Sequence, residues 1–334
     1  MTKKVLITDY VWPSVEPEKA VLAKADATLI IAPNGDESTL INLAKDVDGI
    51  LTCFAKVTDK VVESAEKCVV IGRYGVGVDN IAVDKATEQG IVVTYVPDYC
   101  VDEVSDHVIG LILAWNRRIV LFDRATKNKG WGVEGLGMRM MRLRGKVMGI
   151  VGFGRIGRAV ADKARGFGMT ILASDPVVDA ESVELGGAKK VEMDELLRAS
   201  DFISLHSPLI PSTIHMIGRK ELAVMKSEAF IVNAARGGLI DEDALFEALE
   251  AGSIAGAGLD VVEDVAPPLD HRLIQHENII VTPHTAFFSQ EAVLELEERA
   301  AGEVAKVFQS EMPDNVVNSE VLSRNNLRAT GLDL

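Results

Sequence analysis

The chain has 334 residues, of which 48% are hydrophobic and 25% charged, so a globular protein of two domains is expected. Its formal net charge of −15 argues against a nucleic-acid partner, because a polyanion would be repelled. No apolar run has the length needed to cross a bilayer, and the chain starts on a strand-like run without a secretory signal, so we expect a cytoplasmic protein without membrane partners. Three scattered cysteines show no ligand spacing, so we expect reduced thiols and no metal site.

Short β-branched runs alternate with helical patterns, which predicts parallel sheets covered by helices on both faces. The first set of predicted strands is Val5–Thr8, Ala27–Ile31, Gly49–Leu51, Val69–Ile71 and Ile91–Thr94. The second set is Lys146–Val151, Thr170–Ser174, Lys190–Glu192, Phe202–Leu205, Phe230–Asn233, Gly256–Asp260 and Ile279–Thr282. The long gap between the sets predicts two separate sheets.

The gap itself, Val101 to Arg144, is predicted to be mostly helical. Its apolar residues fall on one helical face, at Val104, Val108, Leu111, Ile112 and Trp115. This face is more apolar than a surface helix needs, so we expect it to link the domains and contact a second subunit. Another helix is predicted for Glu291–Gln309, and its return to the first domain would make that domain discontinuous.

The strongest motif is Gly152-x-Gly154-x-x-Gly157, which follows a predicted strand and opens an amphipathic helix. A second strand then ends at Asp175, about 20 residues on, as a dinucleotide-binding unit requires. The glycines allow a tight turn, a close backbone approach to the pyrophosphate and close helix–strand packing, while the helix N-terminus attracts the phosphates. The alternative is a glycine-rich turn without a ligand.

Asp175 predicts the cofactor. Its carboxylate would accept hydrogen bonds from the adenine ribose and repel a 2′-phosphate, and no arginine follows it. We therefore expect NAD rather than NADP.

Polar residues follow later strands, at the edge where ligands of open parallel sheets bind. Arg236 matches a substrate carboxylate, or alternatively forms a structural salt bridge to Asp241 or Glu242. His284 follows the last strand and could exchange a proton near neutral pH, or serve only in packing. The remaining five histidines are interpreted as structural: His107, His206, His215, His271 and His276.

Seven phrases in this order resemble the D-2-hydroxyacid dehydrogenase family over nearly the whole chain, closest in pattern to its C-terminal-binding-protein-like and phosphoglycerate dehydrogenase branch. They are RYGVGVDNI (73–81), CVDEVSDHVIGLIL (100–113), RLRGKVMGIVGFGRIGRAVA (142–161), HSPLIPST (206–213), NAARGGLID (233–241), GLDV (258–261) and VTPH (281–284). The resemblance implies an α/β protein with two doubly wound parallel-sheet domains. A flavodoxin-like substrate domain would comprise 1–101 and 287–334, and a Rossmann NAD domain 102–286, with a helical arm that forms a homodimer.

The resemblance also implies an oxidoreductase that moves a hydride between nicotinamide and C2 of a 2-hydroxy or 2-oxo acid. Arg236 would bind the substrate carboxylate, His284 would be the general acid/base, and the amides of Val76 and Gly77 would hold the carboxylate. Cofactor contacts would come from Gly152, Gly154, Arg155, Ile156, Gly157, Asp175, Pro208, Thr213, Ala234, Ala235, Arg236, Asp260 and His284.

One family position is not matched. The family places a glutamate five residues after the aspartate of GLDV, where it bonds the catalytic histidine, but this chain has Val265 there. Glu263 is the best substitute as a third catalytic residue, with Asp264 as the next choice, and the histidine could also work without a carboxylate.

A second departure is Phe54, at a substrate-facing position where many relatives carry a polar group. Phe54 is either packing or a contact to a substrate bulkier than glyoxylate, even an aromatic one. The missing glutamate leaves two alternatives to a simple dehydrogenase. One is an NAD-bound enzyme with a net non-redox, lyase-type reaction, and the other is an NAD-sensing interaction protein.

Overall fold

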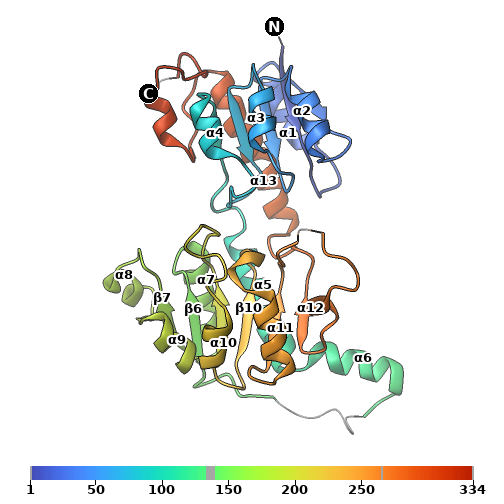
Figure 1. The fold of residues 1–334 in the computed structure, drawn as a ribbon, viewed down its shortest axis with the longest axis vertical. Coiled ribbons are helices and arrows are strands. Elements are labelled where there is room, and N and C mark those ends of the chain that lie inside the picture. Colours follow the sequence, from blue (N-terminus) through green and yellow to red (C-terminus); the bar gives the residue numbers. More distant parts are fainter. Residues whose placement is uncertain (1, 133–139, 265, 333–334) are drawn as a thin grey trace. The chain divides into compact units, whose positions relative to one another are not determined.

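The computed structural model describes residues 2–132, 140–264 and 266–332. Its contacts divide the chain into two compact units, Met1–Tyr99 with Ser289–Leu334, and Cys100–Phe288. Each unit is built on one parallel sheet, as the alternating pattern predicts (Figure 1). Two doubly wound α/β domains are therefore confirmed.

The first unit contains a five-stranded sheet in the order β2-β1-β3-β4-β5, the flavodoxin-like order. Its strands are β1 (Lys3–Ile7), β2 (Ala27–Ile31), β3 (Gly49–Thr52), β4 (Val70–Arg73) and β5 (Val92–Thr94). Strands β3 and β4 are buried along their whole length, in keeping with their mainly apolar sequences.

Helices cover both faces of this sheet. On one face α1 (Glu16–Ala23) packs against α13 (Gln290–Phe308). The other helices of the unit are α2 (Glu37–Ala44), α3 (Asp59–Ser64) and α4 (Val83–Glu88), which contribute to a second apolar cluster. Since α13 belongs to this unit, the unit is assembled from both ends of the chain.

The contact between α1 and α13 contains two buried carboxyl groups, Glu18 and Glu297. Trp12 Nε1 and Tyr74 Oη both donate to Glu18 Oε1, at 3.2 and 3.0 Å. Burial raises the pKa of Glu18, and burial together with the Glu18 carboxyl raises the pKa of Glu297 to about 8. Simultaneous ionisation of both groups is therefore disfavoured at neutral pH.

The second unit contains a seven-stranded sheet in the order β12-β11-β10-β9-β6-β7-β8. Its strands are β6 (Val147–Val151), β7 (Thr170–Ser174), β8 (Lys189–Lys190), β9 (Phe202–Leu205), β10 (Phe230–Asn233), β11 (Gly256–Leu259) and β12 (Ile279–Val281). The order reverses between β6 and β9, which is the switch point where open α/β sheets bind ligands.

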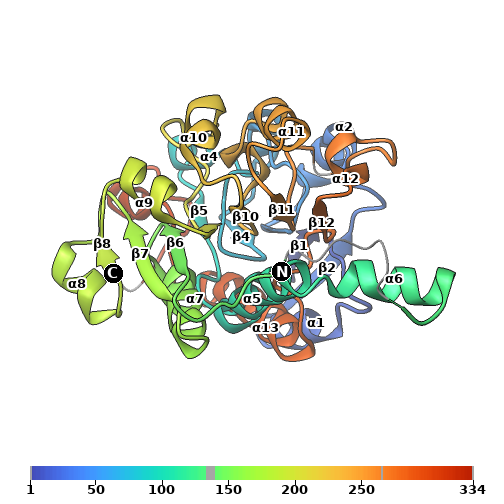
Figure 2. The same cartoon turned by 90° about the horizontal axis from the view of Figure 1, so that it is seen from below.

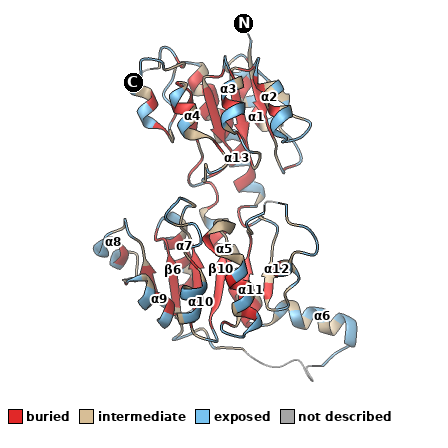
Figure 3. Cartoon of the chain, in the orientation of Figure 1, coloured by how far each residue is buried: buried red, intermediate tan, exposed pale blue. Residues whose placement is uncertain are grey.

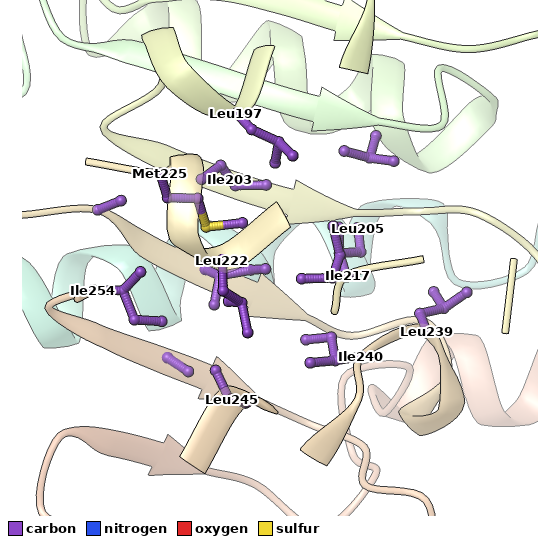
Figure 4. Packing of buried hydrophobic residues seen from close by; sticks show 14 of the residues in the cluster. Leu197, Ile203, Leu205, Ile217, Leu222, Met225, Leu239, Ile240, Leu245 and Ile254 are labelled. Atoms are coloured by element: carbon purple, nitrogen blue, oxygen red, sulfur yellow. The ribbon is translucent and has the colours of Figure 1, made fainter. Parts of the chain in front are cut away.

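Helices also lie on both faces of the second sheet (Figure 2). One face carries α5 (Val101–Asn116) and α7 (Arg155–Gly166), which pack against each other. The opposite face carries α9 (Met193–Ala199), α10 (Arg219–Val224) and α11 (Glu242–Glu250), and Figure 4 shows side chains of the cluster beneath them. Figure 3 shows that the buried residues concentrate on the strands and on the inward helix faces. The short helices α8 (Ala180–Leu185) and α12 (Arg272–Gln275) complete the unit.

The segment after residue 101 is mostly helical, as predicted, but the apolar face of α5 packs inside its own unit, so the expectation that this face contacts a second subunit is not met. All five residues of the predicted apolar face are buried on α5, but the helix ends at Asn116 and α6 (Ile119–Lys129) starts a new one. The break lies at Arg118, whose φ of 55° is left-handed and stops an α-helix. The segment therefore consists of two helices, and residues 133–139 lie outside the described part.

Candidate dinucleotide and substrate site

The turn between β6 and α7 has the shape that a pyrophosphate requires. Gly152 has a φ of 91°, and a Cβ there would lie 2.8 Å from the backbone of His206. A Cβ on Gly157 would lie 2.2 Å from the Gly152 carbonyl oxygen, so α7 packs against the strand as only glycine allows. Gly154, by contrast, faces open space and gives α7 no side-chain cap. The first N–H groups of α7, which include those of Arg155 and Ile156, are thus available to phosphate oxygens.

Asp175 lies directly after β7, beside this turn. Its Oδ2 accepts from the Phe153 N–H at 2.7 Å, and its Oδ1 accepts from Val177 and Val178 at 2.8 and 2.9 Å. Burial opposes ionisation, but these backbone donors outweigh it and lower the pKa of Asp175 below its usual value. The group is therefore a fixed carboxylate, which suits ribose hydroxyls and repels a 2′-phosphate.

The loop after β9 holds two of the predicted cofactor contacts, Pro208 and Thr213. Thr213 Oγ1 donates to the Pro208 carbonyl at 2.6 Å and accepts from the Ile210 N–H at 2.9 Å, which closes the loop on itself. At the start of the loop, burial lowers the pKa of His206 to about 4, so this histidine is neutral at pH 7. Its Nε2 pairs with Ser204 Oγ at 2.8 Å, in keeping with the structural role expected for it.

Arg236 lies after β10, following Ala234 and Ala235. Asn233 fixes this turn, because its amide donates to the Arg236 carbonyl at 2.8 Å and accepts from the Ala235 N–H at 3.1 Å. The two acids that could have held Arg236 in a structural bridge have other contacts. Asp241 caps α11 through the Ala244 N–H, and Glu242 pairs with His271.

The glycine after Arg236 lies against the acidic loop that follows β11. A Cβ on Gly237 would lie 2.0 Å from the Val262 carbonyl carbon, closer than any side chain tolerates. On the next residue, the Gly238 carbonyl accepts from the His215 N–H at 2.8 Å. The turn that carries Arg236, the arginine turn, is thus held between the loops that follow β9 and β11.

His284 lies on a turn that is organised by Asp260. The Asp260 side chain accepts from the Thr282 hydroxyl at 2.6 Å and from the Thr285 and Ala286 N–H groups at 2.9 Å. The Asp260 carbonyl accepts from the His284 N–H at 2.8 Å. His284 has a φ of 53°, a left-handed conformation that costs free energy in a residue other than glycine. Asp260, which is 2% exposed, therefore holds a strained turn in place.

Glu263 is engaged by a different histidine from the one proposed on sequence grounds. Its Oε1 contacts His215 Nε2, and its N–H donates to Glu242 Oε1 at 2.8 Å. In this structure the carboxylate therefore belongs to a His215–Glu263 pair at the rim of the arginine turn. Val265 lies outside the described residues.

The first unit carries the other predicted substrate contacts. Asp9 holds the turn after β3, since its carboxylate accepts from the N–H groups of Cys53 and Phe54 at 3.0 and 2.7 Å. Val76 and Gly77 follow β4, and within the described chain their N–H groups donate to no protein acceptor. Such donors suit an anionic ligand.

Three other aromatic residues, Tyr74, Trp131 and Phe287, lie in different surroundings. Tyr74 is buried, with its ring 4.9 Å from that of Trp12 in an edge-on contact, so it belongs to the core. Trp131 is 98% exposed, just before the undescribed residues 133–139. Phe287 is buried beside His284, with ring centroids 6.2 Å apart.

Comparison with known proteins agrees with this geometry. Residues 109–286 match the model of the D-isomer specific 2-hydroxyacid dehydrogenase NAD-binding domain. The D-3-phosphoglycerate dehydrogenase of Methanocaldococcus jannaschii is 41% identical over 94% of this chain. The chain belongs to this family. The expected class of NAD-dependent oxidoreductase is therefore confirmed.

The chain spans a larger share of the length of some other family members. The chain spans 59% of the M. jannaschii enzyme but 87% of the glyoxylate reductase of Thermococcus litoralis, which is 40% identical over 85% of this chain. The solved D-lactate dehydrogenase of Aquifex aeolicus, in complex with NAD and lactic acid, has a TM-score of 0.84 at 28% identity. That likeness covers 94% of this chain and 98% of the solved one.

Two histidines of this dehydrogenase have contacts that sequence reasoning did not find. His107 contacts Thr282, whose hydroxyl donates to Asp260, and His215 contacts Glu263. No local pattern pointed to either, because their partners lie 175 and 48 residues away in the chain. The family resemblance implied roles for Asp260 and His284 but did not indicate which residues surround them.

Proposed function

We propose that the protein transfers a hydride between NAD and C2 of a 2-hydroxy or 2-oxo acid. One observation carries this proposal. Arg236, Asp260 and the His284 turn all follow strands of the same parallel sheet that carries the dinucleotide turn, so they share its carboxyl edge. A cation for a carboxylate and a titratable imidazole beside a nicotinamide site are the groups that such a reaction needs.

The proposed roles follow from the chemistry of each group. When bound, NAD supplies the hydride acceptor or donor. Arg236 binds the substrate carboxylate and polarises the carbonyl, and His284 gives a proton to that oxygen during reduction or removes it during oxidation. The free N–H groups of Val76 and Gly77 hold the carboxylate. The second unit thus serves as the NAD domain and the first as the substrate domain, with expected limits at 101/102 and 286/287.

Glu263 has a narrower proposed role. Its pairing with His215 favours a part in holding the loop after β11 rather than direct contact with His284. Glu263 would act on His284 only if it left His215, and the two possibilities are separated by mutation, as described in the Discussion.

The substrate class is supported by the relatives. Curated relatives are named for glyoxylate and 3-phosphoglycerate, and a solved neighbour holds lactic acid. We propose a small 2-oxo or 2-hydroxy acid, with Phe54 favouring an apolar substituent on C3. Exchange of Phe54 for asparagine should then shift kcat/KM away from phenylpyruvate and towards glyoxylate or hydroxypyruvate.

The test is NADH oxidation with a panel of 2-oxo acids that runs from glyoxylate to phenylpyruvate. We expect saturable turnover with at least one of them, and His284→Ala and Arg236→Gln should each lower kcat/KM by about 10²–10⁴-fold. A panel without NADH consumption would contradict the proposal. A product formed with only catalytic NAD would instead support the lyase-type alternative, and NAD binding without turnover the sensing one.

The quaternary state is also a proposal. None of the residues of α6 is buried, and this helix extends from the rest of its unit with Ile119 and Leu121 exposed (Figures 1 and 2). Exposed apolar side chains on a projecting helix suit a homodimer contact. A Leu121→Asp variant should then have a smaller mass by light scattering than the wild type, whereas Lys127→Asp on the same helix should not. Cytoplasmic location is proposed on the family alone; in the described residues no helix combines the length and apolarity that a membrane span requires.

A further inference from the structure

His107 lies at the outer end of a hydrogen-bond chain that leads to the His284 turn. Its Nε2 lies 2.8 Å from Thr282 Oγ1, which in turn lies 2.6 Å from Asp260 Oδ1. The direct distance from His107 Nε2 to Asp260 Oδ1 is 3.6 Å. His107 comes from α5, so the chain ties this helix to the turn after β12.

Thr282 decides which atom donates in each of these hydrogen bonds. A hydroxyl has one proton to donate. Asp260 is a carboxylate that accepts at both oxygens, so Thr282 donates to Asp260 and must accept from His107. His107 therefore carries a proton on Nε2. The opposite tautomer would turn the Thr282 proton towards His107 and remove one of the donors that Asp260 receives.

Asp260 connects this chain of hydrogen bonds to the turn that carries His284. The same carboxylate receives the Thr285 and Ala286 N–H groups, and its carbonyl receives that of His284. These bonds hold His284 in its left-handed conformation, which it would leave if they loosened. A shift of about 1 Å in a reacting group is enough to slow catalysis strongly.

We propose that His107 is a positioning residue for the general acid/base His284, acting through the proton that it donates to Thr282. The proposal rests on the proposed function for its catalytic consequence only. The hydrogen-bond chain itself is measurable without any substrate.

The first experiment measures directly which ring nitrogen of His107 carries the proton. Histidine labelled with ¹⁵N, observed in the purified full-length protein without substrate, reports which ring nitrogen carries the proton. We expect His107 to be protonated on Nε2 across pH 6–9, with slow exchange of the Thr285 and Ala286 amide protons. An Nδ1–H tautomer with an unprotonated Nε2 would overturn the proposal.

The second experiment uses two variants of one residue. His107→Leu removes the donor, whereas His107→Gln places an amide N–H near the same point. We expect His107→Leu to speed amide exchange at Thr285 and Ala286 and to lower kcat with the best 2-oxo acid about 10- to 100-fold, with the Kd for NADH unchanged. His107→Gln should recover most of both properties.

Controls separate positioning from general damage. His276→Gln alters a histidine–glutamate pair elsewhere in the same unit and should leave kcat and both exchange rates unchanged. Thr282→Val should resemble His107→Leu, and the double variant should be no worse than either single one, since both break the same chain. Additive losses, or equal losses in His107→Gln and His107→Leu, would refute the proposal. If no 2-oxo acid is turned over, the tautomer and exchange measurements still decide it.

Discussion

The carboxyl groups of Glu18 and Glu297 are neighbours inside the contact between α1 and α13, where burial and the Glu18 carboxyl raise the pKa of Glu297 to about 8. Each has one carboxyl oxygen that no donor side chain satisfies in the described chain. A proton on one of the two groups avoids two buried negative charges side by side, and this explains how two acids are tolerated in a buried helix contact.

This pair predicts a stability that falls as the pH rises. The pKa of Glu297 is raised from its ordinary value of 4.5 to about 8, so the folded state binds more protons than the unfolded state between these values. The stabilisation is therefore fully present below pH 4.5 and is lost as the pH rises through 8. We expect a loss of roughly 1–3 kcal/mol, seen as a decrease of several degrees in Tm between pH 5.5 and 8.5.

Glu297→Gln tests this prediction, because the amide keeps a donor and does not titrate. Its Tm should vary less with pH than that of the wild type, and it should exceed the wild-type value at pH 8.5. Glu311→Gln, an exposed change, should follow the wild-type profile. Parallel profiles of Tm against pH for the wild type and Glu297→Gln would show that the pair holds no such proton.

Asp175→Asn should weaken the preference for NAD. The amide keeps one acceptor but loses the charge that repels a 2′-phosphate and that the three backbone donors stabilise. We expect the Kd for NADH to rise about tenfold and the ratio of Kd values for NADPH and NADH to fall, as measured by fluorescence titration. Asp179→Asn, an exposed helix cap four residues on, should leave that ratio unchanged. An unaltered ratio in Asp175→Asn would mean that another group selects the cofactor.

Gly237→Ala should displace the arginine turn. The added methyl group would overlap the Val262 backbone, so Arg236 and the loop after β11 cannot both keep their positions. We expect kcat/KM to fall by about 100-fold or more, measured together with Tm to separate displacement from unfolding. Gly302→Ala is the matched control. It lies within α13 with open space around it and should stabilise the protein by about 0.5–1 kcal/mol without changing kcat.

Glu263→Gln and His215→Gln should behave alike. Because the two side chains pair with each other, we expect both variants to loosen the loop after β11 and to leave the pH dependence of kcat unchanged. The pH–rate profile of each variant is the measurement. A shift of the profile in Glu263→Gln alone would instead show that this carboxylate partners His284 during turnover.

Local sequence pattern determined much of this protein. The glycine turn with Asp175 about 20 residues on was readable because each of its requirements lies within one βαβ unit. Most of the strands were readable because buried parallel strands are short, largely apolar runs, whereas β8 consists of two lysines. The apolar face of α5 was readable from its helical period. Arg236 and His284 became candidates because polar residues after such strands gather at one edge, but their proposed roles came from the family resemblance.

Tertiary structure alone decided which side chains meet. His107 reaches Thr282 across 175 residues, and Glu18 meets Glu297 because α13 returns to the first sheet. Glu263 was the best substitute for the missing partner of His284, but in this structure its carboxylate contacts His215, so its role towards His284 stays a prediction. The end of α5 at Asn116 likewise depends on Arg118, which adopts a left-handed conformation that is usually found at glycine and that its sequence did not predict. Sequence periodicity fixes the face on which a residue lies, but the packing of whole elements fixes its partner.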